Sequence, residues 1–554
     1  MRAISVLFGG SLGEEAFVPL AGAEGKNAFN LALEQARRFP SVEKTVLLGL
    51  ESREYPGIPP ESGGFSLVRS GNWMRKQVLE TISQISAGCD LVYFAWADCP
   101  FLDPVLAGAL ADRHKRYAAE YSYSDGFPSG FSPELLSPHV AGILCSIDKE
   151  EGVPVERDSI FKVIQKDINA FDIETEISPV DLRLHRLLLA ADSRRNLLLI
   201  NRWLQAVKDF PTVEGAESGA VNIPRAAQAA ALIEKHPELL RTLPAFYNIQ
   251  VVEACPQACV FCPWPGTGRS KSTAYMEGEK FNSILDNIVD FSSDAVISLS
   301  LWGELSLHPQ KIGLISMVLE HPSLSLVVET SGIGWKTEEL ESLAAKASES
   351  PKRKSSLLSS PLSWIVSLDA FNPGRYKEIR GPGHAEASSC ARKLLSLFPG
   401  DAYVQAVRAK GAEDDIEAFY RYWKEVPEAA SPAKSTAGHV IIQKYDHFCG
   451  KLPKLQASDL SPVKRRPCWH LMREICITLE GTVLLCREDL DAFGGKGQRP
   501  NIFSRSLAEI WDDEGEPSSF GLGSASGKKL YLEQSAGIYS NECSDCDEYY
   551  TYNF

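Results

Sequence analysis

Apolar runs alternate with amphipathic stretches along the first two hundred residues. Three runs have the length and composition of buried strands, at residues 3–8, 45–50 and 90–97. Residues 27–38, between the first two runs, repeat apolar side chains at helical spacing. This alternation predicts a largely parallel sheet with helices on both faces, which is a doubly wound α/β domain over residues 1–210. Residues 211–240 predict a linker that ends in a helix leading into the next domain.

The central part of the chain repeats the alternation six times. Six apolar runs have strand length, at residues 247–253, 295–301, 324–330, 364–368, 402–407 and 439–443. Helical patterns separate most of them, at residues 281–291, 311–320, 336–346, 385–397 and 414–424. Six parallel strand–helix units predict an open, partial (βα)6 barrel over residues 241–443, with its chemistry at the carboxyl ends of the strands.

The last hundred residues follow a third pattern. Residues 475–490 alternate apolar and polar side chains across Glu480 and Gly481, which predicts a β-hairpin. Six of the thirteen cysteines of the chain lie in this part. Residues 444–554 therefore predict a small cysteine-rich α+β domain.

The net charge and the hydropathy of the chain limit the binding partners and the cellular compartment that we expect for it. The 554 residues are 44% hydrophobic and carry a net charge of −15. A general affinity for nucleic acid or for anionic membranes needs a basic face, which this charge argues against. No apolar run reaches the roughly 18 residues of a membrane span, and the N-terminal run predicts a strand rather than a signal peptide. We expect a cytoplasmic protein that binds neither nucleic acid nor membrane.

Three cysteines follow the first strand of the predicted barrel. Cys255, Cys259 and Cys262 have the spacing C-x3-C-x2-C. Three thiolates on one short loop can hold three irons of a [4Fe–4S] cluster, which leaves the fourth iron free to bind a small molecule. A structural zinc site is the alternative, but zinc normally takes a fourth protein ligand, and no Cys or His lies close after Cys262.

This loop resembles the signature of the radical S-adenosylmethionine (SAM) superfamily. In that superfamily SAM chelates the free iron through its amino and carboxylate groups, and a reduced cluster cleaves it to a 5′-deoxyadenosyl radical. Other predicted strand ends resemble the same superfamily: Trp302-Gly303-Glu304 resembles its Gly-Gly-Glu motif, with Trp302 in place of the first Gly, and Thr330-Ser331-Gly332 resembles its Thr-Asn-Gly turn. Ser367-Leu368-Asp369, followed by Tyr376 and Arg380, resembles the branch that contains a SPASM module.

The resemblance implies a set of SAM-binding residues. Phe261 would lie at the adenine, and Gly303 and Glu304 would meet the ammonium group through charge-assisted hydrogen bonds. Ser367 and Arg408 match positions that contact the SAM ribose and carboxylate. The implied cofactor-binding set is Phe261, Gly303, Glu304, Thr330, Ser367 and Arg408.

The C-terminal cysteines resemble a SPASM/twitch module, in which a hairpin presents cysteines to an auxiliary cluster. The matching residues are Cys468, Cys486, Cys543 and Cys546, with Gly481 between the first two. The resemblance implies one auxiliary [4Fe–4S] cluster on these four cysteines, and a four-cysteine zinc site is the alternative. Cys449 and Cys476 are left over. We expect Cys476, on the first strand of the hairpin, to be buried packing.

The first domain resembles the nucleotidyltransferase (cytidylyltransferase-like) fold. The Gly-rich loop after the first strand, Asp98 after a buried strand and the later Asp172 carry this resemblance. It implies that Asp98 and Asp172 help to hold Mg²⁺ on a nucleotide. The chain departs from the family where Glu14 and Glu15 stand in place of phosphate-binding Arg and Lys. A degenerate domain, kept for docking or for another ligand, is therefore the alternative.

Together the resemblances imply a radical SAM enzyme similar to the spiro-SPASM protein family. Its substrate would be a peptide or a nucleotide- or sugar-linked small molecule, and its electron donor a protein such as flavodoxin or ferredoxin. Two other hypotheses stay open. One is a zinc-binding structural or interaction protein, and the other is a nucleotidyltransferase without radical chemistry.

Overall fold

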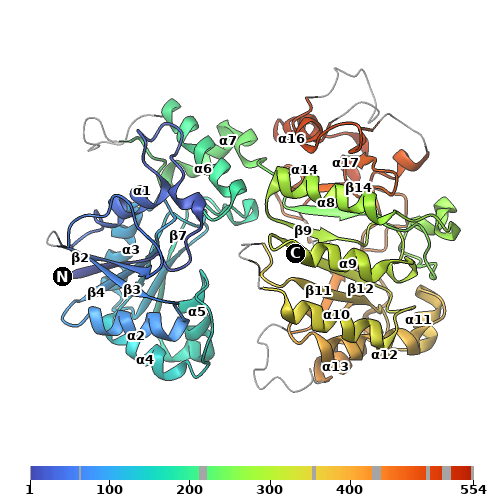
Figure 1. Cartoon of the computed structure of the whole chain (residues 1–554), viewed down its shortest axis with the longest axis horizontal. Coiled ribbons are helices and arrows are strands. Elements are labelled where there is room, and N and C mark those ends of the chain that lie inside the picture. Colours follow the sequence, from blue (N-terminus) through green and yellow to red (C-terminus); the bar gives the residue numbers. More distant parts are fainter. Residues whose placement is uncertain are drawn as a thin grey trace. The chain divides into compact units, whose positions relative to one another are not determined.

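Two sheets organise the chain, one in residues 1–242 and one in residues 243–554 (Figure 1). The computed structural model describes residues 2–61, 64–210, 221–351, 353, 357–426, 438–458, 460–494, 499–514 and 526–550. Part of the predicted linker, residues 211–220, lies outside them. The sequence separates residues 241–443 from residues 444–554, whereas the structure holds both in the second unit.

The first unit contains a mostly parallel sheet in the order β3-β2-β1-β4-β6-β5-β7. Only β6 runs antiparallel to its neighbours among the described strands, pairing with β4 and β5. The strands are β1 (Ala3–Phe8), β2 (Val42–Leu50), β3 (Phe65–Ser70), β4 (Leu91–Trp96), β5 (Tyr121–Asp125), β6 (Glu134–Leu136) and β7 (Ile173–Ile177). The helices are α1 (Ala28–Ala36), α2 (Arg75–Ile85), α3 (Pro104–Arg116), α4 (Pro138–Ile147), α5 (Ser159–Ile164), α6 (Arg194–Ala206) and α7 (Ala229–Lys235).

Helices cover both faces of this sheet, as the sequence predicts. Because side chains alternate along a strand, Leu7 of β1 packs with Phe29 of α1 and Leu110 of α3. Its neighbours on the other face pack against α2, α4 and α5, where Val78 is one of the contacts. The predicted helix at residues 225–240 is shorter in the structure, where α7 has 3₁₀ turns on either side.

The second unit is an open barrel whose sheet has the order β13-β12-β11-β10-β9-β8-β14-β15. Its strands are β8 (Phe246–Ile249), β9 (Ala295–Ser298), β10 (Leu324–Thr330), β11 (Leu362–Ser367), β12 (Ala402–Arg408), β13 (Val440–Lys444), β14 (Glu474–Ile477) and β15 (Val483–Leu484). The first six are parallel to one another. The predicted hairpin forms as β14 and β15, but β14 continues the barrel sheet, parallel to β8.

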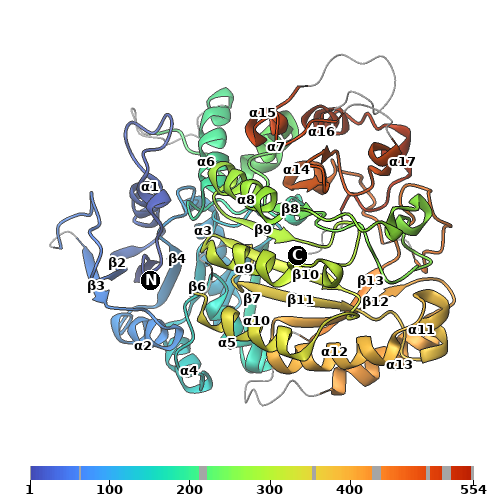
Figure 2. The ribbon, with the colours of Figure 1, turned by 45° about the vertical axis from the view of Figure 1, so that its right-hand side comes forward.

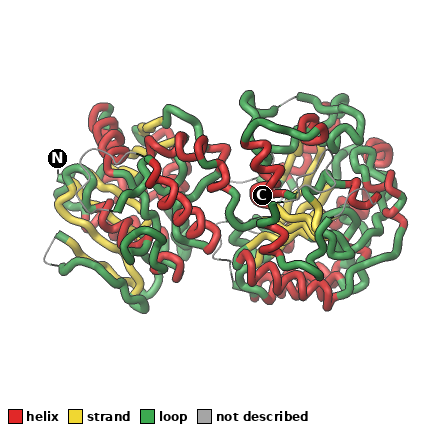
Figure 3. Tube along the Cα trace, turned by 90° about the horizontal axis from the view of Figure 1, so that it is seen from above, coloured by secondary structure: helices red, strands yellow, loops and turns green. Residues whose placement is uncertain are grey.

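Helices such as α8, α9, α10 and α12 lie along the outer side of this sheet (Figure 2), and in Figure 3 helices flank the strands of each unit. The described helices of the second unit are α8 (Gly278–Ser292), α9 (Lys311–Glu320), α10 (Thr337–Glu349), α11 (Pro373–Ile379), α12 (His384–Leu397), α13 (Glu413–Glu425), α14 (Trp469–Arg473), α15 (Leu507–Trp511), α16 (Gly527–Ser535) and α17 (Asn541–Asp545). Tyr247, Trp364 and Tyr376 are fully buried in the core between sheet and helices. In the part of the chain that the structure describes, no helix combines the length and the apolar character needed to cross a bilayer.

A buried ion pair connects α2 with the end of α4 in the first unit. Arg75 Nε donates to Asp148 Oδ2 at 2.7 Å, and the two side chains are 6% and 0% exposed. Lys166 also contacts Asp148, at 2.8 Å, and Glu150 contacts Arg75 at 2.8 Å. Burial by itself would raise the pKa of Asp148, but the hydrogen bonds from Arg75 and Lys166 outweigh it and lower that pKa. The carboxylate is therefore ionised at neutral pH.

We expect Asp148→Ala to lower the free energy of unfolding by roughly 3 kcal/mol, the low end for breaking a buried pair, because Glu150 still faces Arg75. The pair's contribution is present above the unfolded-state pKa of about 3.9. It is lost as the pH falls through the lower folded-state pKa. Denaturant unfolding followed by circular dichroism measures both effects. Asp181→Ala, which removes an exposed partner of Arg183, is the control and should cost less than about 1 kcal/mol. Equal losses in the two variants would contradict this account.

The turn after β9 places a glycine against the chain that follows β8. Gly303 has a φ of +118°, and a Cβ built there would lie 2.0 Å from the carbonyl oxygen of Val252. The next residue, Glu304, donates its N–H to the carbonyl oxygen of Ala254 at 2.9 Å. The turn therefore runs beside the start of the cysteine loop, and only a residue without a side chain fits at position 303.

Gly303→Ala should lower the free energy of unfolding by roughly 3 kcal/mol, because left-handed strain and overlap with the backbone act together. Gly313→Ala is a matched control, since Gly313 lies in α9 and a Cβ there meets nothing within 4 Å. That variant should be neutral or more stable by up to about 1 kcal/mol, because Ala favours helix over Gly. Chemical denaturation compares the two. Similar stability of both variants would show that the turn has room at position 303.

Candidate functional site

A cavity of about 280 Å³ lies inside the barrel, among the carboxyl-terminal parts of its strands. Cys255, Cys259 and Cys262 line it from the loop after β8. Phe261 lines it from the same loop, and four other predicted site residues line it from later strand ends: Gly303, Glu304, Thr330 and Ser367. Because parallel strands end at the same edge, residues more than a hundred positions apart meet around one space.

The cysteine loop is held by backbone hydrogen bonds to the end of α11. The N–H groups of Ala258 and Val260 donate to the carbonyl oxygens of Arg380 and Ile379, at 3.2 and 2.9 Å. Cys255 N–H donates to the carbonyl oxygen of Ser270 at 3.0 Å. The loop therefore has fixed contacts on two sides, and its three sulfurs share one wall of the cavity.

Arg380 ties the same loop to the end of β11. Its guanidinium forms a buried ion pair with Asp369 and donates from Nε to Gln257 Oε1 at 2.8 Å. Asp369 has a φ of +61° and accepts the N–H of Val407 at 2.7 Å. Gln257 completes the connection by donating to Tyr376 Oη at 2.7 Å. A cation is thus fixed directly beside the three thiols.

Burial sets the protonation of these thiols. It raises the pKa of Cys255 to about 11 and that of Cys262 to about 12. Burial also raises the pKa of Cys259, although Arg380 opposes the shift. Without a bound metal the thiols are therefore protonated at neutral pH, and a metal that binds there must displace protons.

Glu304 is a buried carboxylate with oriented oxygens. It is 4% exposed, and its Oε1 accepts from Thr330 Oγ1 at 2.5 Å and from Ser306 N–H at 3.3 Å. Its Oε2 accepts from Ser331 N–H at 2.6 Å. A carboxylate offers about four acceptor positions, so three described donors leave capacity toward the cavity. Thr330 thus positions Glu304, which the sequence could not reveal.

A layer of polar side chains lines the barrel above an apolar floor. Each of the six parallel strands β8–β13 contributes one residue to the layer: Asn248, Ser298, Glu329, Ser367, Gln405 and Gln443. Two positions earlier, each strand contributes one residue to the floor: Phe246, Val296, Val327, Ile365, Tyr403 and Ile441. Except for Ser367, the sequence analysis missed this layer. Its signal is an apolar residue followed two positions later by a polar one, repeated in all six strands.

Glu329 is the acceptor at the centre of this layer. Its Oε1 accepts hydrogen bonds from Ser367 Oγ and from Gln405 Nε2, both at 2.9 Å. Ser367 therefore bonds to another strand rather than standing alone in the cavity. The layer gives the barrel interior a hydrogen-bonding surface that a purely apolar core lacks.

Arg408, predicted to face the cofactor, does not line this cavity. It is exposed, whereas Gln405 and Val407 of the same strand line the cavity. Because side chains alternate along a strand, position 408 is one residue out of phase with the interior. The assignment of Arg408 is corrected accordingly.

A second, smaller cavity of about 60 Å³ lies among the C-terminal cysteines. The four predicted ligands line it, together with Cys449: Cys449, Cys468, Cys486, Cys543 and Cys546. Basic side chains, among them Arg465 and Arg487, and acidic ones, among them Glu488 and Glu542, line the same space, so charges of both signs lie around the sulfurs. Cys476 lies elsewhere, 1% exposed in an apolar cluster, which confirms its prediction as packing.

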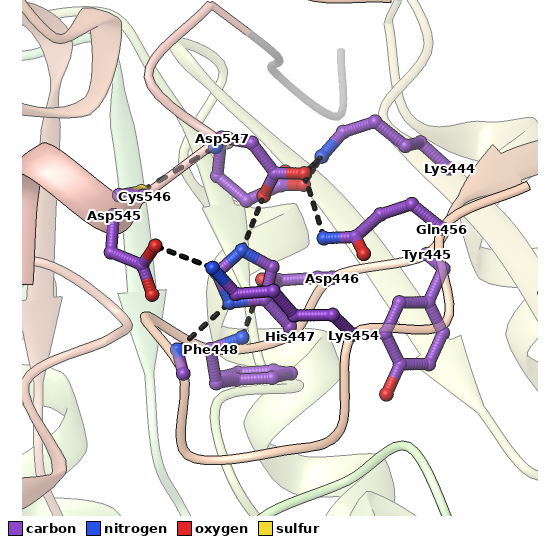
Figure 4. A network of polar contacts seen from close by, with 12 residues as sticks. Lys444, Tyr445, Asp446, His447, Phe448, Lys454, Gln456, Asp545, Cys546 and Asp547 are labelled. Atoms are coloured by element: carbon purple, nitrogen blue, oxygen red, sulfur yellow. Dashed lines mark hydrogen bonds and ion pairs between the residues drawn. The ribbon is translucent and has the colours of Figure 1, made fainter. Parts of the chain in front are cut away.

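Three carboxylates lie between the two cavities. Asp446, Asp547 and Glu548 offer oxygens within 4.8 Å of one another, and no other three potential ligands among the described residues lie as close. Lys444 pairs with Asp547, at 3.0 Å, and with Glu548. Arg487 pairs with Asp446 at 2.8 Å. These cations offset two of the three carboxylate charges, so the acidic group is part of an ion-pair network rather than a vacant cation site. Figure 4 shows the contacts of Asp547 with Lys444 and His447.

The structure does not bring Asp98 and Asp172 together. Asp98 follows the carboxyl end of β4, whereas Asp172 precedes β7, where its carbonyl oxygen accepts the N–H of Glu120 before β5. Since β5 and β7 run in the direction of β4, the two residues lie at opposite edges of the sheet. Asp98 also pairs with Arg157 at 2.6 Å. The prediction that Asp98 and Asp172 together hold one Mg²⁺ is therefore wrong.

Parts of the chain resemble solved structures. BtrN in complex with AdoMet and 2-DOIA matches at 16% identity, covering 55% of this chain and 93% of that one, with a TM-score of 0.33. Streptococcus suis SuiB bound to precursor peptide SuiA matches at 15% identity, over 61% and 86%, with a TM-score of 0.39. A cytidylyltransferase from Leptospira borgpetersenii matches at 15% identity, over 43% and 95%, with a TM-score of 0.34. TM-scores this low give no evidence about the site, so its function has to be inferred from its own geometry.

Sequence comparison gives a closer relationship. No family model matches the chain. An uncharacterized protein of Treponema pallidum (strain Nichols) is 34% identical over 402 residues, which cover 71% of this chain and 98% of that protein. At this identity and coverage, the chain belongs to the same family as the uncharacterized Treponema pallidum protein.

Proposed function

We propose that the chain is a radical SAM enzyme, in which Cys255, Cys259 and Cys262 hold a [4Fe–4S] cluster whose fourth iron binds SAM. One observation carries the proposal. The three thiols line a cavity of about 280 Å³ together with Glu304 and with a polar residue from each of the six parallel strands β8–β13. When bound and reduced, such a cluster would supply one electron to the SAM sulfonium, so that the S–C5′ bond would break to give methionine and a 5′-deoxyadenosyl radical.

The donor set suits such a cluster. Soft thiolates are the usual ligands of iron–sulfur centres, and three of them leave one iron for an outside ligand. Zinc is the alternative, and its tetrahedral thiolate sites place sulfurs about 3.8 Å apart for Zn–S bonds of about 2.3 Å. No three cysteine sulfurs among the described residues lie within 4.8 Å of one another, so neither cysteine set is drawn together around a single ion.

The residues around the thiols have separate roles in this proposal. Glu304 accepts hydrogen bonds from the SAM ammonium with the acceptor capacity that its three protein donors leave. Gly303 lets the turn that carries Glu304 approach Val252. Phe261 lies in the cavity wall beside Cys262 and would contact the adenine. Arg380 keeps a positive charge beside the thiolates, which favours their ionised form.

The polar layer is evidence that the substrate is polar, because it offers hydrogen-bonding groups inside the cavity. Glu329, fixed by Ser367 and Gln405, would accept from a hydroxyl or amino group, and Asn248 and Gln443 add further amides. A peptide and a nucleotide- or sugar-linked small molecule both carry such groups. The second cysteine set would hold one auxiliary cluster, and a protein such as flavodoxin or ferredoxin would supply electrons.

Reductive cleavage of SAM tests the function. Anaerobically reconstituted protein with dithionite and SAM should release 5′-deoxyadenosine, and Cys259→Ala should release none above the rate without protein, because the first cluster loses a ligand. Cys390→Ala is the matched control, since that cysteine is buried in the core of the same unit, away from both cavities. Equal release by Cys259→Ala and the parent protein would exclude the proposed role of the loop.

Glu304→Gln tests the ammonium contact. The amide turns an NH₂ group toward the donors on Thr330 and Ser331, and it removes the charge that favours an ammonium. We expect SAM affinity to fall about 30-fold, which corresponds to roughly 2 kcal/mol for charged hydrogen bonds. Equilibrium binding of labelled SAM to the reconstituted protein measures it. Unchanged affinity would remove Glu304 from the proposed site.

A further inference from the structure

The second cysteine cavity contains one thiol more than a four-iron cluster needs. Cys449 lies on the loop after β13 and lines the cavity with the four predicted ligands. No spacing motif includes it, and eighteen residues lie between it and Cys468 in the sequence. A four-iron cluster can bind only four of these five sulfurs at a time. The contacts of Cys449 indicate which of the other four cysteines it would replace.

The loop that carries Cys449 is clamped to the segment that carries Cys546. Asp547 receives contacts from Lys444 at 3.0 Å, from Gln456 Nε2 at 3.2 Å and from His447 Nε2 at 3.7 Å (Figure 4). Lys454 adds an ion pair to Asp545 at 2.7 Å. These contacts come from both sides of Cys449 in the sequence, and they reach the residues on both sides of Cys546.

The backbone at Cys449 is turned so that neighbouring side chains enter different cavities. Phe448, Cys449 and Gly450 have φ values of +50°, +52° and +82°. A left-handed conformation at a non-glycine residue is strained and persists only where the surroundings impose it. Phe448 lines the first cavity, where its ring centroid is 5.5 Å from that of Trp302, and Cys449 lines the second. The strained turn thus presents the Cys449 thiol to the other sulfurs.

Within the second cavity, Cys449 lies beside Cys546 in particular. A Cβ built at the next residue, Gly450, would lie 3.1 Å from a carboxylate oxygen of Asp545, the residue before Cys546, and the two cysteine side chains interact directly. Thiolates on different irons of a cubic cluster point to different corners and do not contact each other. Two cysteine side chains that lie in contact therefore face the same corner. Cys468 is positioned separately, at the start of α14, where its N–H donates to Gln534 Oε1 at 2.8 Å.

We propose that Cys449 and Cys546 are alternative ligands for one iron of the auxiliary cluster, so that either thiol can complete a site formed by Cys468, Cys486 and Cys543. The inference rests on the proposed function, because it needs a cluster in this cavity. It adds a fifth residue to the ligand set and gives the strained turn at Phe448 and Cys449 a role. When one sulfur binds the iron, the other is left as a neighbouring thiol.

Iron analysis of cysteine variants tests the inference without any assay of activity. All variants carry Cys255→Ala, Cys259→Ala and Cys262→Ala, so that bound iron belongs to the second site. After anaerobic reconstitution, iron and sulfide per chain are measured, and the reduced protein is examined by electron paramagnetic resonance. Cys449→Ala and Cys546→Ala should each keep the iron of this background. The double variant should lose iron, as should Cys468→Ala, and Cys476→Ala should leave both the iron and the spectrum unchanged.

Loss of iron in Cys546→Ala or in Cys449→Ala, to the level of Cys468→Ala, would overturn the inference, as would full iron in the double variant. Circular dichroism before reconstitution verifies the fold of each variant, and Cys546→Val replaces Cys546→Ala if the latter does not fold. The outcomes separate the two proposals. An intact chain that binds no iron contradicts both of them, whereas iron in the background that depends on Cys546 alone contradicts only the exchange of ligands.

Discussion

The parallel hydrogen bonding of β8 to β13 is the constraint on which the site depends. Because the six strands run in one direction, their carboxyl ends meet at one edge, and residues from position 255 to position 443 converge there. An antiparallel strand would send its end to the opposite edge. Position relative to the strand matters as much: in the first unit β4 and β7 run in the same direction, but Asp98 follows its strand and Asp172 precedes its strand, so the two residues lie at opposite edges of that sheet.

Strand direction alone does not orient the three thiols. Backbone contacts between the cysteine loop and residues 379–380 do so, together with the buried pair of Arg380 and Asp369. Glu304 is oriented in the same way, by Thr330 and Ser331 from the next strand. The cysteine loop and Glu304 are thus each held by residues from a later strand–helix unit of the chain. The polar layer lines the same cavity.

The sequence predicts features that depend on a local pattern of residues, and it misses those that depend on contacts between distant parts of the chain. The six barrel strands, the cysteine spacing and the packing role of Cys476 follow from runs and spacings that lie within a few residues. The place of β14 beside β8 does not, because it joins positions 474 and 246. Arg408 was assigned by resemblance to a family position, and the resemblance did not reveal that its side chain is out of phase with Gln405 and Val407, which line the cavity. Cys449 has no motif, so only the folded loop brings it to Cys546.

The central claim is that the three-cysteine loop leaves one iron open to SAM. Electron paramagnetic resonance of the reduced protein tests it most directly, in a variant with Cys468→Ala and Cys486→Ala so that the signal belongs to the first site. The account predicts a cluster signal whose g values change when SAM is added, because SAM binds the iron itself. A signal that SAM leaves unchanged, or no cluster signal in the presence of all three cysteines of the loop, would contradict it.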